Sequence, residues 1–238
     1  MLHGNKYAFD RQTDRQTDRQ TDRQTEVDNC SFVKCCLMFL VVFYHSILFY
    51  SGIDWFVGKP LYVVDSLKWF SGWLNSFHIY AFTLVSGYLY FYLRYESGKY
   101  QHFKEFLINK LKRLIVPYVF VCVCWVIPVS CFFFNYTAGD IFKKYVLATA
   151  PSQLWFLWML FDIFVIVYCL SDVIYKSKVV SIIVSLAGIC IGAVGGKLFP
   201  NVFCIWIGCS YIAYFILGCK IRQYGSDRLN RFGVTTWF

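Results

Sequence analysis

The sequence predicts an all-α membrane protein, a polytopic bundle of about six transmembrane helices. Hydrophobic residues make up 58% of its 238 residues and aromatic residues 21%, whereas soluble domains are typically about 45–50% apolar. Several runs with few charges are as long as a bilayer-crossing helix, which needs roughly 20 apolar residues. The 11 cysteines lie mostly inside these runs, and none forms a pair with zinc spacing. We therefore interpret them as small buried residues and expect no metal site.

Composition divides the chain into three parts. Residues 1–29 lack the apolar core of a signal peptide and contain four copies of Asp-Arg-Gln-Thr at 10–25, so we expect a disordered cytoplasmic tail. Residues 30–219 are expected to form the membrane domain, and residues 220–238 a basic cytoplasmic tail at a truncated end.

The tetrapeptide repeat has an explanation at the level of DNA. The codons GAC-AGA-CAG-ACA encode Asp-Arg-Gln-Thr and consist of repeated GACA units. We therefore hypothesise that the stretch reflects a simple DNA repeat and phase variation of expression. A basic arm that binds lipid headgroups is the alternative, but the alternating aspartates cancel most of its charge.

Each expected span is separated from the next by a polar or glycine-containing segment. The first two spans are joined by a loop with Gly52, Gly58 and Pro60. Pro117 and Pro128 fall inside the third span, where a membrane helix tolerates them. The expected spans are residues 30–50, 73–93, 114–134, 154–175, 179–198 and 202–219.

The lysines and arginines orient these spans. With a cytoplasmic N-terminus, 18 of the 23 basic residues fall in or beside cytoplasmic segments and 5 in external loops. Cytoplasmic loops carry the excess of Lys and Arg in membrane proteins. We therefore expect both termini to be cytoplasmic, in a multi-pass protein of the inner membrane. The net charge of +9 is read as a topology signal, and no nucleic-acid partner is implied.

Two ionisable residues, Lys34 and His45, lie in the first span. They are eleven residues apart, which is close to three helical turns, so they share a face about 16 Å apart along the axis. A lysine that snorkels to the headgroups would explain Lys34 alone. His45 lies deeper, and an ionisable side chain at that depth favours a functional role.

Two more ionisable residues are expected at a depth similar to that of His45. His78 lies near the external end of the second span and Asp162 in the outer half of the fourth. An interfacial histidine and a packing hydrogen bond are the structural alternatives for these two residues. Because a charged group in a span needs a partner or water, we expect a polar cavity that opens outward.

Lys110 and Arg113 end a basic segment at the cytoplasmic side of the third span. They are three residues apart and share a helical face. Arginine can bind phosphate oxygens through two parallel hydrogen bonds, and lysine acts as a point charge. Plain anchoring on lipid headgroups explains the same spacing, so both interpretations stand.

Five segments, in this order, resemble the acyltransferase-3 family of integral membrane acyltransferases. The first has a basic residue, ten intervening residues and a histidine, here Lys34 to His45. The second contains His78 and the tripeptide Ser86-Gly87-Tyr88, and the third has Lys110 where the family usually has arginine. The segments are KCCLMFLVVFYHS (34–46), FHIYAFTLVSGYLY (77–90), FLINKLKRLIVPY (106–118), LWFL (154–157), which includes Trp155, and YFILG (214–218).

This resemblance implies transfer of an acyl group, usually acetyl, from cytoplasmic acyl-CoA to a hydroxyl of a lipid-linked or cell-surface glycan. Acyl-CoA would be a co-substrate, with no permanently bound cofactor. His45 would be the general base or the transient acyl carrier, because an imidazole can accept a proton at neutral pH.

The same resemblance suggests roles for the other candidates. Lys34 would assist on the CoA path, and His78 is a further catalytic candidate. Lys110 and Arg113 would hold the CoA phosphates. The residues assigned to the polar cavity are Asp162, Ser86 and Trp155.

The chain departs from the family in one respect. Members usually have more than six spans, so we expect this chain to be a truncated member. A non-enzymatic transporter or flippase subunit, in which the histidines and Asp162 relay protons, is the alternative, and an inactive fragment is another. The ordered motifs favour the acyltransferase.

Overall fold

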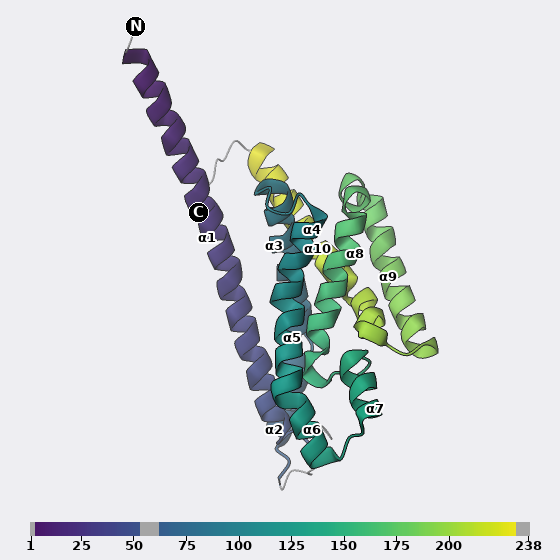
Figure 1. Ribbon diagram of the computed structural model, residues 1–238. Helices are drawn as coiled ribbons and strands as arrows, with labels where there is room; N and C mark the ends of the chain where they lie inside the picture. The colour runs from purple at the N-terminus through teal and green to yellow at the C-terminus, as the bar shows by residue number, and fades with distance from the viewer. Residues whose placement is uncertain (1–2, 53–61, 232–238) are drawn as a thin grey trace. The chain divides into compact units, whose positions relative to one another are not determined.

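The computed structural model describes residues 3–52 and 62–231, and every regular element within them is a helix (Figure 1). The predicted all-α class is therefore confirmed. Five of these helices are long and apolar enough to cross a membrane, which makes the protein a multi-pass membrane protein. They are Gln24–Leu48, Phe103–Phe134, Ser152–Lys176, Lys178–Leu198 and Val202–Gly225.

The chain forms two compact units, Met1–Val85 and Ser86–Phe238. The first unit contains α1 (His3–Leu48), α2 (Asp65–Asn75) and the first half of α3 (His78–Phe91). Within it, α2 packs against α1.

Helix α1 extends far beyond the first predicted span. The tetrapeptide repeat belongs to this helix, where the sequence predicts a disordered tail. Residues 5–51 contain neither glycine nor proline. Because adding a residue to an existing helix costs much less than nucleating one, nothing in this stretch forces the membrane helix to end before the repeat.

The second predicted span is interrupted near its start. Helix α2 ends at Asn75 and α3 begins at His78, followed by a π-helical segment, Tyr92–Glu96. At the break, the Ser76 hydroxyl donates a hydrogen bond to the Trp73 carbonyl at 2.6 Å. Asparagine and serine side chains compete for backbone groups in this way and so favour helix ends. The loop residues Gly58 and Pro60 lie outside the described residues.

The third span is one long helix, and its prolines coincide with changes of helical type. Pro117 and Pro128 each lie in the first turn of an α-helical piece that follows a π-helical segment. Proline lacks an N–H and its ring clashes with the carbonyl four residues earlier, so the wider π turn relieves that contact. The pieces are α4 (Phe103–Lys110), Leu111–Ile115 (π), α5 (Val116–Val121), Cys122–Val126 (π) and α6 (Ile127–Phe134).

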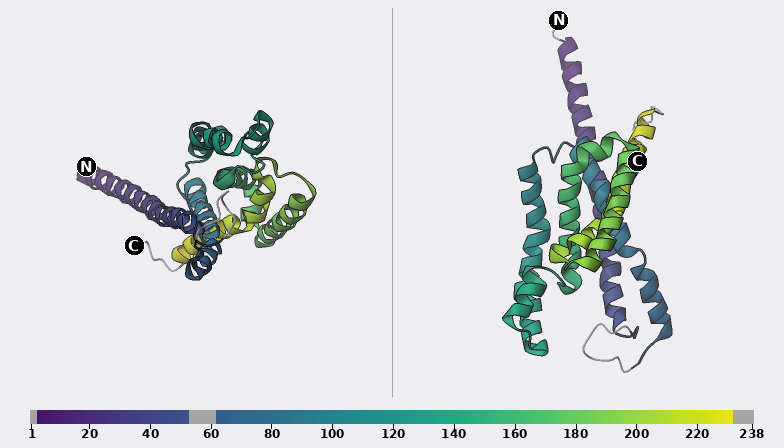
Figure 2. Two further views of the ribbon diagram at one scale, coloured as in Figure 1. Left: turned by 90° about the horizontal axis from the view of Figure 1, so that it is seen from below. Right: turned by 90° about the vertical axis from the view of Figure 1, so that its right-hand side faces the viewer.

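The remaining helices of the second unit follow in order. Helix α10 packs against both α9 and α8, as Figures 1 and 2 show. It continues beyond the predicted span, so the first part of the expected basic tail is helical, and residues 232–238 lie outside the description. The elements are α7 (Ala138–Ile141), Phe142–Val146 (π), Ser152–Leu154 (3-10), α8 (Trp155–Lys176), α9 (Lys178–Leu198), Val202–Cys204 (3-10) and α10 (Ile205–Arg231).

Aromatic side chains form the centre of the second unit. The Tyr90 ring lies edge-on to Phe106 and Phe164, with centroids 5.8 and 5.9 Å apart. Phe164 in turn meets Phe215 of α10 at 5.0 Å. Edge-to-face pairs of this kind contribute about 0.5–1.5 kcal/mol each beyond the burial of their area. The cluster therefore ties α3, α4, α8 and α10 together.

The tripeptide Ser86-Gly87-Tyr88 of α3 packs against α10 within this unit. A Cβ atom on Gly87 would lie 2.8 Å from the carbonyl carbon of Phe215, so only glycine permits this approach. The Tyr88 hydroxyl accepts a hydrogen bond from Arg222 at 2.7 Å, and Arg222 also makes a paired contact with Glu96, at 2.9 and 2.7 Å. Gly87 and Tyr88 thus help to pack α3 against α10.

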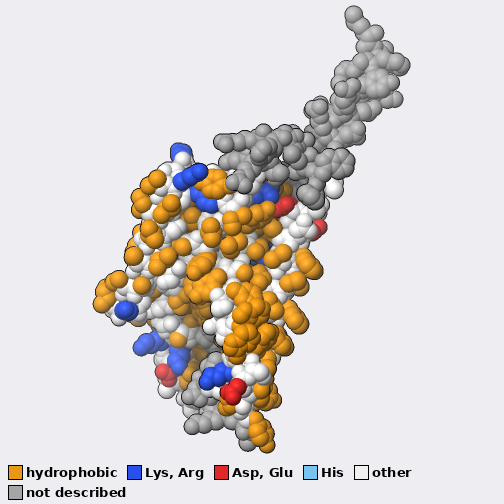
Figure 3. All heavy atoms as spheres, turned by 180° about the vertical axis from the view of Figure 1, so that it is seen from behind, with side chains coloured by type: hydrophobic (Ala, Val, Ile, Leu, Met, Phe, Trp, Pro, Cys, Tyr) orange, Lys and Arg blue, Asp and Glu red, His pale blue; other side chains and the backbone are white. Residues whose placement is uncertain are grey.

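The surface is strongly hydrophobic. Large side chains such as Phe132, Phe120 and Ile182 are exposed. On the face that Figure 3 shows, hydrophobic side chains cover most of the area, while lysines and arginines gather toward its ends. A water-soluble monomer rarely exposes so large an apolar area, so this surface fits contact with lipid.

Candidate active site

The first unit groups two histidines around one tyrosine. His45 and Tyr44 come from α1, and His78 is the first residue of α3. The Tyr44 ring lies 5.1 Å from the His45 ring and 5.1 Å from the His78 ring, between centroids. The structure thus brings together two of the three predicted catalytic residues.

His78 is held by the end of α2. Its Nδ1 atom donates a hydrogen bond to the carbonyl oxygen of Leu74. The last carbonyls of a helix have no partner within that helix, and Leu74 lies in the last turn of α2. Leu74 is fully buried and His78 is 1% exposed. The interruption of the second predicted span therefore fixes the orientation of this imidazole.

Lys34 lies on the same helix as His45 but makes a different contact. Its Nζ atom is 5.5 Å from the centre of the Phe82 ring, one turn after His78 on α3. An ammonium group over an aromatic face is attracted by the ring quadrupole. The structure therefore places Lys34 against α3, and it places His45 beside Tyr44, whose ring meets the first residue of α3.

In the second unit, Lys110 is enclosed by aromatic rings. Its Nζ atom lies 3.5 Å from the centre of the Phe164 ring, 5.1 Å from that of Tyr100 and 5.5 Å from that of Phe106. Lys110 is 7% exposed, whereas Arg113 is exposed. Burial raises the pKa of the Tyr100 hydroxyl, and the positive charge of Arg113 opposes that rise. The two predicted phosphate-binding residues thus both lie near Tyr100 but differ in access to water.

Arg94 was not predicted as a site residue, and it lies on the same aromatic cluster. Its guanidinium group lies 3.7 Å from the centre of the Tyr168 ring and donates a hydrogen bond to the Tyr90 hydroxyl at 2.8 Å. Tyr168 stacks on Phe106 with centroids 4.5 Å apart. Tyr90 and Arg94 are four residues apart, and residues at this spacing are neighbours on a helix. The sequence could therefore have predicted their hydrogen bond.

The predicted cavity residues all belong to the second unit. Asp162, on α8, faces Gly208 of α10. A Cβ atom added to Gly208 would lie 3.5 Å from the Cβ atom of Asp162. Trp155 meets Tyr211 of α10 at 6.0 Å between centroids. Oδ2 of Asp162 and Oγ of Ser86 are buried and have no hydrogen-bond partner among the described residues. Buried polar atoms without a partner are rare and require an explanation.

The candidates therefore form two separate groups. The first compact unit contains Lys34, His45 and His78. The second contains Lys110, Arg113 and the predicted cavity residues. Their convergence on one outward-opening cavity stays a prediction.

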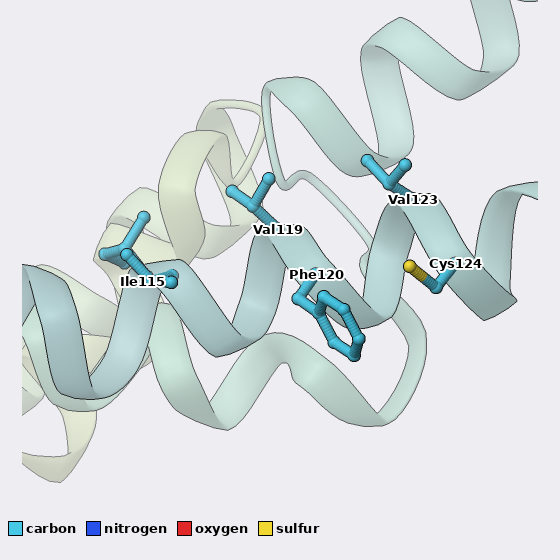
Figure 4. A pocket seen from close by; sticks show the side chains of 6 residues that line it. Ile115, Val119, Phe120, Val123 and Cys124 are labelled. Atoms are coloured by element: carbon cyan, nitrogen blue, oxygen red, sulfur yellow. The ribbon is translucent and has the colours of Figure 1, made fainter.

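A hollow of about 420 Å³ lies along the third span, in the second unit (Figure 4). Five of the six side chains that line it are hydrocarbon and the sixth is a cysteine, so it contains no histidine, carboxylate or cation. We interpret it as part of the lipid-facing surface. The lining residues are Ile115, Val116, Val119, Phe120, Val123 and Cys124.

The fold and these residues first define a class, a polytopic helical membrane protein with two imidazoles grouped beside its apolar helices. A family model described as an acyltransferase domain, that of the acyltransferase-3 family, matches residues 28–237. The chain therefore belongs to this family, and the protein is a membrane acyltransferase. No match was found among curated proteins or among solved structures.

Proposed function

We propose that the protein is an O-acyltransferase that moves an acetyl group from acetyl-CoA to a hydroxyl of a cell-surface or lipid-linked glycan. Membership of the acyltransferase family supports the reaction class. The observation that carries the proposal is the pair of imidazoles around Tyr44. Histidine is the side chain best suited to exchange protons near neutral pH.

In this proposal, the donor enters from the cytoplasm and the glycan is modified at or beyond the outer half of the inner membrane. Arg113 is the exposed contact for phosphates of the donor, and Lys110, the other predicted phosphate ligand, lies among aromatic rings. Lys34 lies on the donor side of α1, about three turns from His45. The excess of basic residues in the expected cytoplasmic segments supports a cytoplasmic N-terminus.

His45 has two chemical options in this reaction. As a general base, it takes the proton from the acceptor hydroxyl while that oxygen attacks the thioester carbonyl. As a carrier, its nitrogen attacks the thioester, and the acyl group stays on the imidazole until the acceptor arrives. Only the second option produces a covalently labelled protein when labelled acetyl-CoA is supplied without acceptor.

The test is glycan acetylation by His45→Ala in cells that contain the full-length chain. We expect a loss of about 10²–10⁴-fold, while the amount of protein in the membrane stays at the wild-type level. His102→Ala is the matched control, because His102 is exposed and lies outside the candidate spans. Unchanged acetylation in His45→Ala, measured as ester-linked acetate on purified polysaccharide, would contradict the proposal.

A further inference from the structure

The two ring nitrogens of His78 are in different situations. Nδ1 donates to the Leu74 carbonyl, and Nε2 makes no hydrogen bond with any described residue. The side chain is nevertheless 1% exposed. The contact with Leu74 therefore occupies one ring nitrogen, and the second nitrogen can still bind a substrate hydroxyl.

The hydrogen bond to Leu74 decides the tautomer of the neutral ring. A carbonyl oxygen can only accept, so the proton of neutral His78 must be on Nδ1. Nε2 then carries the lone pair, and it is the one ring atom that can take up a further proton. Backbone carbonyls commonly set the reactive nitrogen of functional histidines in this way.

We propose that His78 is the general base for the acceptor hydroxyl and that His45 is the transient acyl carrier. This inference rests on the proposed function and assigns the two histidines separate steps. Both rings contact Tyr44, so the two histidines share one neighbour within the first unit.

The two steps balance in atoms and electrons. First, a nitrogen of neutral His45 attacks the thioester carbonyl, an N–C bond forms, and the C–S bond breaks with its electron pair leaving on the CoA thiolate. Second, the acceptor oxygen attacks the acyl-imidazole while His78 Nε2 takes its proton. The C–O bond forms and the N–C bond breaks, which frees His45. The proton on His78 finally passes to water.

His78→Asn separates this role from a merely structural one. The asparagine Nδ2 atom is bonded to Cγ, as His78 Nδ1 is, so it can donate the same hydrogen bond to Leu74. It has nothing in the position of Nε2. His78→Gln is the complementary variant, since its amide reaches the Nε2 position and lacks the Nδ1 donor.

The experiment supplies radioactive acetyl-CoA to membranes that contain the full chain and the cell's own polysaccharide. In His78→Asn, we expect labelled protein and a first round of CoA release as in the wild type, but transfer to the polysaccharide that is slower by about 10²–10⁴-fold. His78→Gln should transfer equally slowly, and the Leu74 carbonyl then keeps only the Phe77 N–H as a donor.

Two results would overturn the inference. Transfer at the wild-type rate by His78→Asn would show that the hydrogen bond to Leu74 is all that His78 contributes. Absence of labelled protein, in the wild type or the variant, would show that no acyl carrier forms before the acceptor reacts. Failure of the proposed function is a separate result, because wild-type membranes would then transfer no acetyl group to polysaccharide at all.

Discussion

Lys110 and Arg113 are one turn apart, yet their charged groups have opposite surroundings. The Lys110 ammonium lies among the rings of Tyr100, Phe106 and Phe164, and such contacts contribute about 2 kcal/mol when they are desolvated. The Arg113 guanidinium is exposed and keeps its planar set of donors available for a bidentate contact. We therefore expect Arg113 to contact the donor's phosphates and Lys110 to hold the aromatic cluster together.

Arg113→Gln tests this division. A hydrogen bond to a charged group contributes about 1.5–3 kcal/mol, so we expect KM for acetyl-CoA to rise on the order of 10-fold to 100-fold. A contact made equally in the ground and transition states leaves kcat unchanged. Initial rates at varied acetyl-CoA and fixed acceptor provide the measurement. Lys112→Gln, at an exposed neighbouring position, is the charge-matched control, and equal KM values for the two variants would argue for lipid anchoring only.

At the same scale, the sequence predicted the candidates but not their environments. The spacing of Lys34 and His45 predicted that they share one helical face, and the spacing of Lys110 and Arg113 predicted the same for that pair. The aromatic enclosure of Lys110 was not predictable, because Phe164 comes from a helix more than fifty residues later. Nor could spacing show that Leu74 would fix His78, since that contact depends on where α2 ends.

Helices α9 and α10 approach closely because α9 presents glycines at the contact. A Cβ on Gly192 would lie 2.6 Å from the Trp206 carbonyl oxygen, and one on Gly195 would lie 2.6 Å from a ring carbon of the same tryptophan. Small residues at such contacts let helix backbones pack tightly in membranes, where no hydrophobic force distinguishes a helix from lipid. Serines on both helices bond to their own backbones, as Ser210 does to the Trp206 carbonyl at 3.1 Å.

Gly192→Ala should therefore destabilise the protein, by about 1–3 kcal/mol if it behaves as an overpacked core position. Gly196→Ala is the matched control, because its Cβ would make only an ordinary 3.8 Å contact with Trp206. Alanine is a better helix former than glycine by about 0.8–1.0 kcal/mol, so the control should be neutral or stabilising. Thermal aggregation of the purified protein in detergent measures both. Equal midpoints for the two variants would mean that α9 and α10 are less closely packed than described.

Hydropathy predicted which segments form apolar helices. It did not predict the residues at which these helices begin and end. Long runs without charge predicted the helices because a membrane leaves backbone groups no partner except their own helix. The ends depended on local chemistry that hydropathy ignores. Asn75 and Ser76 break the second span, and the third begins at Phe103, well before its apolar part, because nothing between Phe103 and Pro117 interrupts a helix.

For the whole molecule, the sequence indicated a membrane acyltransferase, and the family match confirms that class. It could not show whether the histidines and Asp162 face one cavity. That requires the placement of one compact unit against the other, and a single sequence contains no pattern that sets such an angle. The orientation in the membrane likewise rests on the positive-inside bias.

The tetrapeptide repeat leads to a prediction about expression of the entire chain. If it is encoded as a GACA tract, gain or loss of one unit shifts the reading frame and removes everything after residue 25, including every candidate site residue. Gain or loss of three units restores the frame. Sister colonies should therefore differ in unit number, and glycan acetylation should follow the reading frame. A tract of mixed synonymous codons, or one whose length never varies between sequenced colonies, would contradict this switch.

The continuity of α1 gives in-frame length variants a defined geometry. The repeat and the Lys34–His45 stretch belong to one unbroken helix. Three added GACA units encode four residues, and these residues lengthen that helix. Four extra residues extend it by about 6 Å and turn its free end by about 40° beyond one full turn. The end of α1 that contains His45 keeps its register, because the insertion lies before it. Tandem copy number would then set the distance between the N-terminus and the Lys34–His45 stretch.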